Sequence, residues 1–222
     1  MSSYREMDEK HLGLRAHVLS SIMQLLREKK LEEISVGDIC EKAGTSRATF
    51  YRLFSSKNDI FNWYMRVTLR ASIEQVGVVF PWDQALLRFF RDMDANRELA
   101  RCFFASEEKG NPTHILQRYI EGILRANVLQ RFPDQEDISW RYGFQIEAFS
   151  VAFSHAVPRW LSTSNPPYVM VDLVCSIVPS ELFSLLNTKI DGEPFNHSTL
   201  REGDYTPLVS FVSEFSWRNF PY

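Results

Sequence analysis

Residues 35–57 read SVGDICEKAGTSRATFYRLFSSK, and this stretch decides the fold. Ser35, followed three residues later by Asp38, is a capping-box arrangement, which predicts that a short helix begins there. Apolar residues then recur with helical spacing as far as Ala43. Gly44 supplies the residue type that ends a helix in a left-handed turn. The pattern therefore predicts a short helix closed by a tight turn.

A second short helix is expected directly after this turn, over about Arg47–Phe54, with Thr45 or Ser46 as its N-cap. Its apolar face should pack on the preceding helices and consists of Phe50, Leu53 and Phe54. Its opposite face carries Arg47, Ala48, Thr49, Tyr51 and Arg52. Guanidinium and hydroxyl groups suit phosphates and base edges. Two short helices joined by a tight turn can place the second one in a DNA major groove.

Lys57 supplies an independent argument for DNA binding. The pair Ser56 and Asp59 predicts a further helix, from Lys57 to about Gln75. The helix dipole disfavours a cation at a helix N-terminus, unless a phosphate shares the site with the free backbone N–H groups. On these residues alone the alternative stays open, because helix–turn–helix hairpins without a DNA function are common in all-α proteins.

Helical spacing continues on both sides of this stretch. The predicted helices outside it are Leu12–Lys29, Trp82–Asp94, Asn96–Ser106, Pro112–Phe132, Asp137–Leu161 and Pro167–Leu186. Pro179 is expected to kink the last of them. No run with the period of a strand and no internal repeat is present, and only nine glycines occur. The sequence therefore predicts an all-α fold.

Three parts follow from this pattern. They are an N-terminal three-helix domain over 10–56, a helical body over 57–187, and a partly irregular tail over 188–222 with a short helix near Leu208–Phe215. Residues 1–70 carry 12 Lys and Arg against 9 Asp and Glu, whereas the remainder carries 13 against 19. A basic first domain on an acidic body fits a DNA-binding domain joined to a body that does not touch DNA.

Composition and missing motifs exclude several function classes. Cys40, Cys102 and Cys175 form no CxxC pair and no metal-ligand spacing, which is typical of small core residues in a reducing cytoplasm. The sequence has no apolar signal region and no uncharged apolar stretch long enough for a membrane span. It also lacks the common hydrolase, phosphate-loop, zinc-protease and dinucleotide motifs. We expect a cytoplasmic protein that is not an enzyme and uses no metal, cofactor or membrane.

Residues 34–61, ISVGDICEKAGTSRATFYRLFSSKNDIF, resemble the N-terminal domain of TetR/AcrR transcriptional regulators. That family pattern is a Thr- or Ser-capped helix with D-I-A, then A-G-V-S, then G-T-x-Y-x-x-F, then S-K-x-x-L. The blocks appear here as Ser35, Asp38–Cys40, Ala43–Ser46, Ala48–Tyr51, Phe54, Ser56–Lys57 and Ile60. The similarity covers about residues 12–65 and implies a helix-turn-helix domain that binds DNA.

The resemblance also implies a role for each matching residue. The residues implied to face the major groove are Arg47, Thr49 and Tyr51, with Tyr51 mainly on phosphate. Those implied to hold the DNA backbone are Ser35, Thr45, Ser46 and Lys57, and Arg52 is implied to reach a phosphate or a base. The sequence departs from the family at Leu53, where a histidine often stands. Any contact made there is in doubt, and Leu53 is expected in the core.

The same resemblance implies that the body is a ligand-binding and dimerisation domain, whose last two helices form a four-helix bundle with a second subunit. Two apolar stripes agree with this, because a single chain is expected to bury only part of them. The first is Phe149, Phe153, Ala156, Val157 and Trp160, and the second is Val171, Val174, Val178, Leu182 and Leu185. The alternative is that both stripes are ordinary core.

A ligand pocket is predicted among the helices from Trp82 to Phe153, since 14 of the 30 aromatic residues fall in 80–160 and aromatic-lined cavities are typical small-molecule sites. Side chains that could orient a ligand are His114, Arg118, Trp140, Tyr142 and His155. The alternative is that most of these rings are core, and that His155 is a hydrogen-bonded core histidine.

Together these features predict a sequence-specific DNA-binding regulator that is a homodimer on an operator. The leading hypothesis is a repressor released by a small apolar or aromatic ligand, because a ligand shifts populations only if it prefers one state. The alternative is a regulator without a small-molecule ligand, controlled by a protein partner. An enzyme or carrier with a degenerate first domain is a third class, which the intact motif disfavours.

Overall fold

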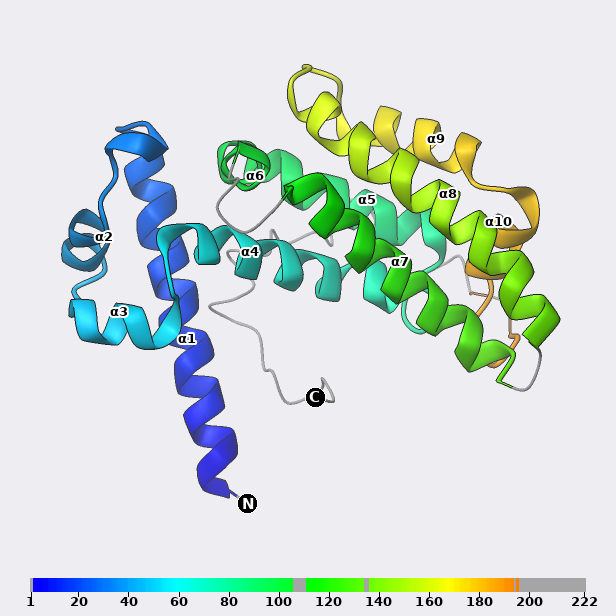
Figure 1. Cartoon of the computed structure of the whole chain (residues 1–222), viewed down its shortest axis with the longest axis horizontal. Coiled ribbons are helices and arrows are strands. Elements are labelled where there is room, and N and C mark those ends of the chain that lie inside the picture. Colours follow the sequence, from blue (N-terminus) through cyan, green and yellow to red (C-terminus); the bar gives the residue numbers. More distant parts are fainter. Residues whose placement is uncertain (1, 106–110, 134–135, 194, 196–222) are drawn as a thin grey trace. The chain divides into compact units, whose positions relative to one another are not determined.

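The computed structural model describes residues 2–105, 111–133, 136–193 and 195 (Figure 1). The regular structure of these residues is helical apart from one isolated bridge between Val76 and Phe80, which confirms the predicted fold class. The helices are α1 (Ser2–Leu26), α2 (Val36–Lys42), α3 (Arg47–Leu53), α4 (Lys57–Ala71), α5 (Trp82–Ala95), α6 (Arg97–Ala105), α7 (Pro112–Arg131), α8 (Glu136–Leu161), α9 (Pro167–Ile177) and α10 (Ser180–Leu186), with the 3₁₀ turns η1 (Leu31–Glu33) and η2 (Ile73–Gln75).

Two compact units divide the chain within α4, between Arg66 and Val67. We call residues 2–66 the head and the described residues from 67 onward the body. In the head, α1 packs against α2 and α3, and α2 packs against α3. Six side chains of the head are completely buried: Ile22, Ile39, Phe50, Ile60, Phe61 and Met65. Such burial is the main term that stabilises a three-helix unit of this size.

The body is built on α7 and α8, which run side by side, with α5 packed against α9 (Figure 1). Its centre is a cluster of aromatic rings whose neighbouring centroids lie 5.1–5.9 Å apart, close to edge-to-face or tilted. The members are Trp82, Phe89, Phe90, Phe149, Phe153 and Trp160, and none is more than 3% exposed. These aromatic residues of α5 and α8 therefore form a packed core, as the alternative interpretation of the sequence expected.

The two apolar stripes predicted to await a partner are also core. Phe149, Phe153, Val157 and Trp160 are at most 3% exposed, and Val171, Val174, Val178 and Leu182 at most 8%. The expectation that one chain buries only part of these stripes was wrong for these eight residues, because α5 and the α8–α10 segment cover each other. A different face of α8 and α9 stays exposed, and it is described below.

Pro179 breaks the last predicted helix instead of kinking it. α9 ends at Ile177, and Val178 and Pro179 are extended before α10 begins at Ser180. Proline removes an N–H donor and disfavours helical backbone in the residue before it. α1 also differs from its prediction, since it begins at Ser2, ten residues before the predicted start at Leu12. The predicted helix at 208–215 lies outside the described residues.

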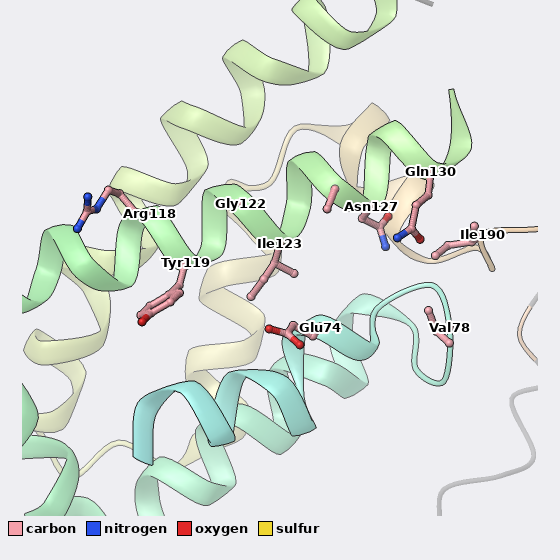
Figure 2. Close-up of a pocket in the computed structure, with 10 residues that line it drawn as sticks. Glu74, Val78, Arg118, Tyr119, Gly122, Ile123, Asn127, Gln130 and Ile190 are labelled. Carbon is pink, nitrogen blue, oxygen red and sulfur yellow. The ribbon is translucent and has the colours of Figure 1, made fainter. Parts of the chain in front are cut away.

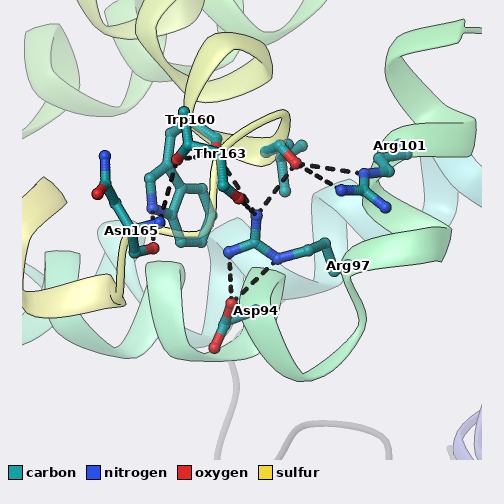
Figure 3. Close-up of polar contacts among 7 residues, drawn as sticks. Asp94, Arg97, Arg101, Trp160, Thr163 and Asn165 are labelled. Atoms are coloured by element: carbon teal, nitrogen blue, oxygen red, sulfur yellow. Dashed lines mark hydrogen bonds and ion pairs between the residues drawn. The ribbon is translucent and has the colours of Figure 1, made fainter.

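Arg97 and Arg101 of α6 tie the α5–α6 corner to the C-terminal end of α8 (Figure 3). The Arg97 guanidinium donates to the carbonyls of Leu161 at 3.0 Å and Thr163 at 2.8 Å. It also pairs with Asp94 at 2.6 Å, and its Cζ lies 4.6 Å from the ring centroid of Trp160. Arg101 donates to the Leu161 carbonyl at 2.9 Å. These cations satisfy carbonyls that a helix end leaves without partners.

We expect Arg97→Ala to lower the free energy of unfolding by about 2–3 kcal/mol, because it removes charge-assisted hydrogen bonds and a cation–π contact together. Urea denaturation followed by circular dichroism measures this. The matched control is Arg125→Ala, which removes an exposed pair with Glu121 on α7 and should cost less than about 1 kcal/mol. Equal losses for the two variants would contradict the structural role given to Arg97.

Candidate DNA interface

The N-terminal cap of α2 forms as the sequence predicts. The Asp38 N–H donates to the Ser35 hydroxyl oxygen at 3.1 Å, and the Ser35 N–H and hydroxyl both donate to the Asp38 carboxylate at 2.8 Å. These hydrogen bonds hold the pKa of Asp38 below its ordinary value. The Ser35 hydroxyl is thus engaged in the cap, although the residue is exposed beside the motif.

The turn between α2 and α3 depends on Gly44, whose φ is +57°. The Thr45 N–H closes the turn by donating to the Cys40 carbonyl at 2.9 Å. The ring of His17 on α1 contacts the Ala43 carbonyl, with its Nε2 at 3.1 Å. His17 links the turn to α1 over 26 residues, and the sequence pattern of the motif contained no sign of it.

Gly44→Ala is expected to destabilise the protein by about 1–2 kcal/mol, since a side chain disfavours positive φ. An added Cβ at Gly44 meets nothing within 4 Å, so only the backbone conformation is at issue. Gly13→Ala is the matched control, because its Cβ also meets nothing but lies within α1. That control should gain about 0.5–1 kcal/mol. Thermal unfolding of both variants tests the pair, and a neutral Gly44→Ala would contradict the strain argument.

α3 presents the two faces that the sequence predicts. Ser46 caps it by accepting from the Thr49 N–H at 3.1 Å. Phe50, Leu53 and Phe54 are 0–6% exposed, so the expectation that Leu53 lies in the core is confirmed. Arg47, Ala48, Tyr51 and Arg52 are exposed, and Thr45 and Thr49 are half-exposed. Tyr51 keeps 56% of its surface accessible. The surface that the sequence assigns to DNA is therefore open to solvent.

Gly37 makes room for Arg47 beside α2. A Cβ built on Gly37 would lie 3.0 Å from a terminal nitrogen of the Arg47 guanidinium, so a larger residue would require the end of this side chain to shift by a few tenths of an ångström. The guanidinium thus lies against the first turn of α2, at the start of the exposed face of α3. The sequence analysis did not single out this contact.

Lys57 has a structural partner that the sequence did not reveal. Its ammonium group donates to the carbonyls of Leu31 at 2.9 Å and Ile34 at 3.1 Å, 26 and 23 residues earlier in the chain. These bonds tie the start of α4 to η1. An ammonium has three N–H donors, so one remains for a phosphate. The implied phosphate contact stays a prediction, and the tether is an additional role.

The five predicted ligand-orienting residues do not gather around one cavity. His114 and Arg118 are exposed on α7, and Trp140 is 78% exposed on α8. Tyr142 stacks on Phe132 with centroids 6.1 Å apart. His155 is exposed, and its Nδ1 lies 2.9 Å from the Val151 carbonyl of its own helix, so the alternative of a core histidine was wrong. Of these five, Arg118 lines a groove described below.

The described part of the chain contains neither a metal site nor a membrane-spanning helix. Among these residues, no group of three or more His, Cys, Asp or Glu side chains is arranged to hold a metal ion. No helix there is both long enough and apolar enough to span a membrane.

Comparison with known proteins gives three findings. Residues 18–62 match the family described as bacterial regulatory proteins, tetR family. The chain is 36% identical over 59 residues to the uncharacterized HTH-type transcriptional regulator YvdT of Bacillus subtilis (strain 168), which is 27% of this chain and 30% of that protein. It is also similar to the HTH-type dhaKLM operon transcriptional activator DhaS of Lactococcus lactis subsp. lactis (strain IL1403). The two are 22% identical over 100 residues, which cover 45% of this chain and 54% of that protein.

A solved structure of the dihydroxyacetone kinase operon activator DhaS shares the fold. Its TM-score with this chain is 0.58 at 15% sequence identity, over 76% of this chain and 96% of that one. The sequence matches span about a third and about half of the length of the two curated relatives. The structural likeness therefore extends the similarity of fold into the body.

Proposed function

We propose that this chain, whose residues 18–62 match the tetR family of bacterial regulatory proteins, regulates transcription by binding an operator as a homodimer. The observation that carries the proposal is the exposed face of α3, where Arg47, Tyr51 and Arg52 stand open to solvent while Phe50 and Phe54 anchor the helix from behind. A short helix with cations and hydroxyls on its free face fits the major groove.

In the proposed complex, the residues that read or position DNA are Arg47, Thr49, Tyr51 and Arg52 of α3 together with the caps and the start of α4 at Ser35, Thr45, Ser46 and Lys57. Phosphate contacts position the helix and base contacts specify the sequence. Tyr51 and the third N–H of Lys57 are proposed for phosphate. Arg47 is proposed for a base edge, because arginine pairs bidentately with guanine.

The proposed dimer surface is the apolar face that α8 and α9 leave uncovered. Its members are Trp140, Phe144 and Val151 on α8 and Tyr168, Leu173 and Ile177 on α9, each 40–78% exposed. The three α8 residues recur at helical spacing along one side. Exposed apolar residues gathered in this way mark an interaction surface. A second copy is the occupant that fits, since two identical heads suit the two halves of a symmetric operator.

A small molecule that changes operator affinity is the proposed control, and release of a repressor by such a ligand is the leading form of it. The name of the relative DhaS describes that protein as an activator. Whether this chain represses or activates transcription therefore has to be measured separately. Control by a protein partner is the second candidate function. The packed aromatic cluster of the body favours it over a ligand cavity at that place.

Operator binding is tested by footprinting and gel-shift titration on the DNA that flanks the gene itself. The expected result is protection of two half-sites whose centres lie about one helical turn, ~34 Å, or a multiple of it apart. Affinity should fall steeply with added salt, because phosphate contacts release counterions. Retention no stronger than on unrelated DNA of the same length, at every site tested, would overturn the proposal.

A further inference from the structure

A groove on the body lies between η2 and α7, away from the aromatic core (Figure 2). Its volume is about 460 Å³, within the range of about 300–1,000 Å³ that is usual for small-molecule sites. Seven of its lining residues come from α7, and the others are Glu74, Val78 and Ile190. We infer that this groove binds a small organic cation, with Glu74 as the counter-ion.

Glu74 is the single carboxylate that lines the groove. Figure 2 shows it on η2, with Ile123 of α7 reaching toward it. No hydrogen bond or salt bridge joins its carboxylate to any of the described side chains or backbone groups, although Arg70 acts on it electrostatically. The carboxyl group is reachable by solvent, yet burial by its surroundings raises its pKa. An opposite charge beside a carboxylate favours its ionised form, so Glu74 would stabilise a cation that enters the groove.

Gly122 lies in the middle of α7 and lines the groove. It is exposed, and a Cβ added there meets no atom within 4 Å, so it lies beside open space. A large side chain at this position would therefore extend into the groove.

The other residues that line the groove indicate which further features the ligand should have. Ile123, Val78 and Ile190 offer apolar contact, and the ring of Tyr119 can receive a cation on its face. Asn127 is already engaged, since its amide donates to the Val76 carbonyl at 2.7 Å. Arg118 is at the rim, and Figure 2 shows its side chain directed away from Glu74. A monocation with an aliphatic or aromatic body matches this arrangement, whereas an anion would meet the Glu74 carboxylate.

The position of the groove gives such a ligand a route to the head. Glu74 follows α4 after two residues, and α4 begins at Lys57, which is tied to η1 in the head. A cation that draws η2 toward α7 would therefore act on the C-terminal end of α4. The N-terminal part of α4 belongs to the head. That the cation is the effector rests on the proposed regulator function, but its binding in the groove does not.

Binding is measured by isothermal titration calorimetry on the full chain without DNA. The probes are phenethylammonium, phenethyl alcohol and phenylacetate, which share a phenyl body and differ in charge. We expect saturable binding of the cation below about 10 mM, as its size allows, and at least about tenfold weaker binding of the other two. No saturable binding of the cation, or equal binding of phenylacetate, would overturn the inference.

Two variants locate the site. Glu74→Gln should remove the preference for the cation, and Gly122→Leu should remove binding altogether by filling the groove. The matched control is Asp83→Asn, an exposed carboxylate on α5 that does not line the groove. Far-ultraviolet circular dichroism checks that each variant is folded. Cation binding that persists in both Glu74→Gln and Gly122→Leu would show that the groove is not the site.

A gel shift with the same probes separates this inference from the proposed function. If the cation binds at Glu74 and the protein shows no operator, the groove stands and the regulator proposal fails. If an operator is found and the calorimetry shows no binding of the cation, the regulator proposal stands and the inference about the groove fails. If both stand, phenethylammonium should change operator affinity in the unaltered protein and leave Glu74→Gln unaffected.

Discussion

Tyr51→Ala is expected to weaken operator binding by about tenfold to a hundredfold while leaving the melting temperature unchanged. The side chain is 56% exposed, and its ring lies in a T-shaped arrangement with Phe50, with centroids 5.5 Å apart. Removing it should therefore cost little stability, whereas a phosphate contact on each of two heads is worth about 1–3 kcal/mol in total. Fluorescence anisotropy with labelled operator measures the affinity.

Two further variants show which part of Tyr51 acts. Tyr51→Phe keeps the ring and removes the hydroxyl, so it should reproduce most of the loss if the hydroxyl bonds a phosphate. Lys57→Ala should differ from both, because it also breaks the bonds to the Leu31 and Ile34 carbonyls and thus lowers the melting temperature. An affinity in Tyr51→Ala equal to that of the unaltered protein would remove α3 from the interface.

Leu173→Asp is expected to convert the proposed dimer to monomers and to lower operator affinity by about a hundredfold or more. The residue lies on the proposed dimer surface of α8 and α9 and is 56% exposed. A charge there would be desolvated on association. Once the two heads are unlinked, the second half-site no longer benefits from a high effective concentration. Light scattering should show the mass of one chain, 25.9 kDa.

The chain offers a closely matched control for this prediction. Leu129 on α7 is exposed to the same extent, 56%, but lies outside the proposed dimer surface. Leu129→Asp should leave both the mass and the operator affinity unchanged. If Leu173→Asp stays dimeric, or if both variants dissociate, the α8–α9 face is not the contact between the two copies.

The head could be predicted closely because its signals are local. The bonds between Ser35 and Asp38 and between Ser46 and Thr49 each span three residues, and the left-handed turn needs only Gly44. The faces of α3 follow from the period of a helix, which places Phe50 and Phe54 on one side and Tyr51 on the other. The tether of Lys57 and the linkage through His17 span more than twenty residues, and no local pattern encodes them.

The aromatic rings of the body could not be placed from the sequence, because composition counts rings without placing them. Phe90, Phe153 and Trp160 come from two helices and fill the core between them. The groove instead brings Glu74 together with Ile123, 49 residues away, at a helix surface that is not especially aromatic.

What the amino-acid sequence determined by itself is most of the helices, the caps of α2 and α3, and the surface that α3 presents, because these depend on contacts within one or two helical turns. Only the tertiary structure decided which apolar side of α8 is core. Both sides carry large apolar residues, Phe149 and Phe153 on one and Trp140 and Phe144 on the other. Periodicity identifies an apolar face, but burial depends on which helix packs against it, and that is a property of the whole body.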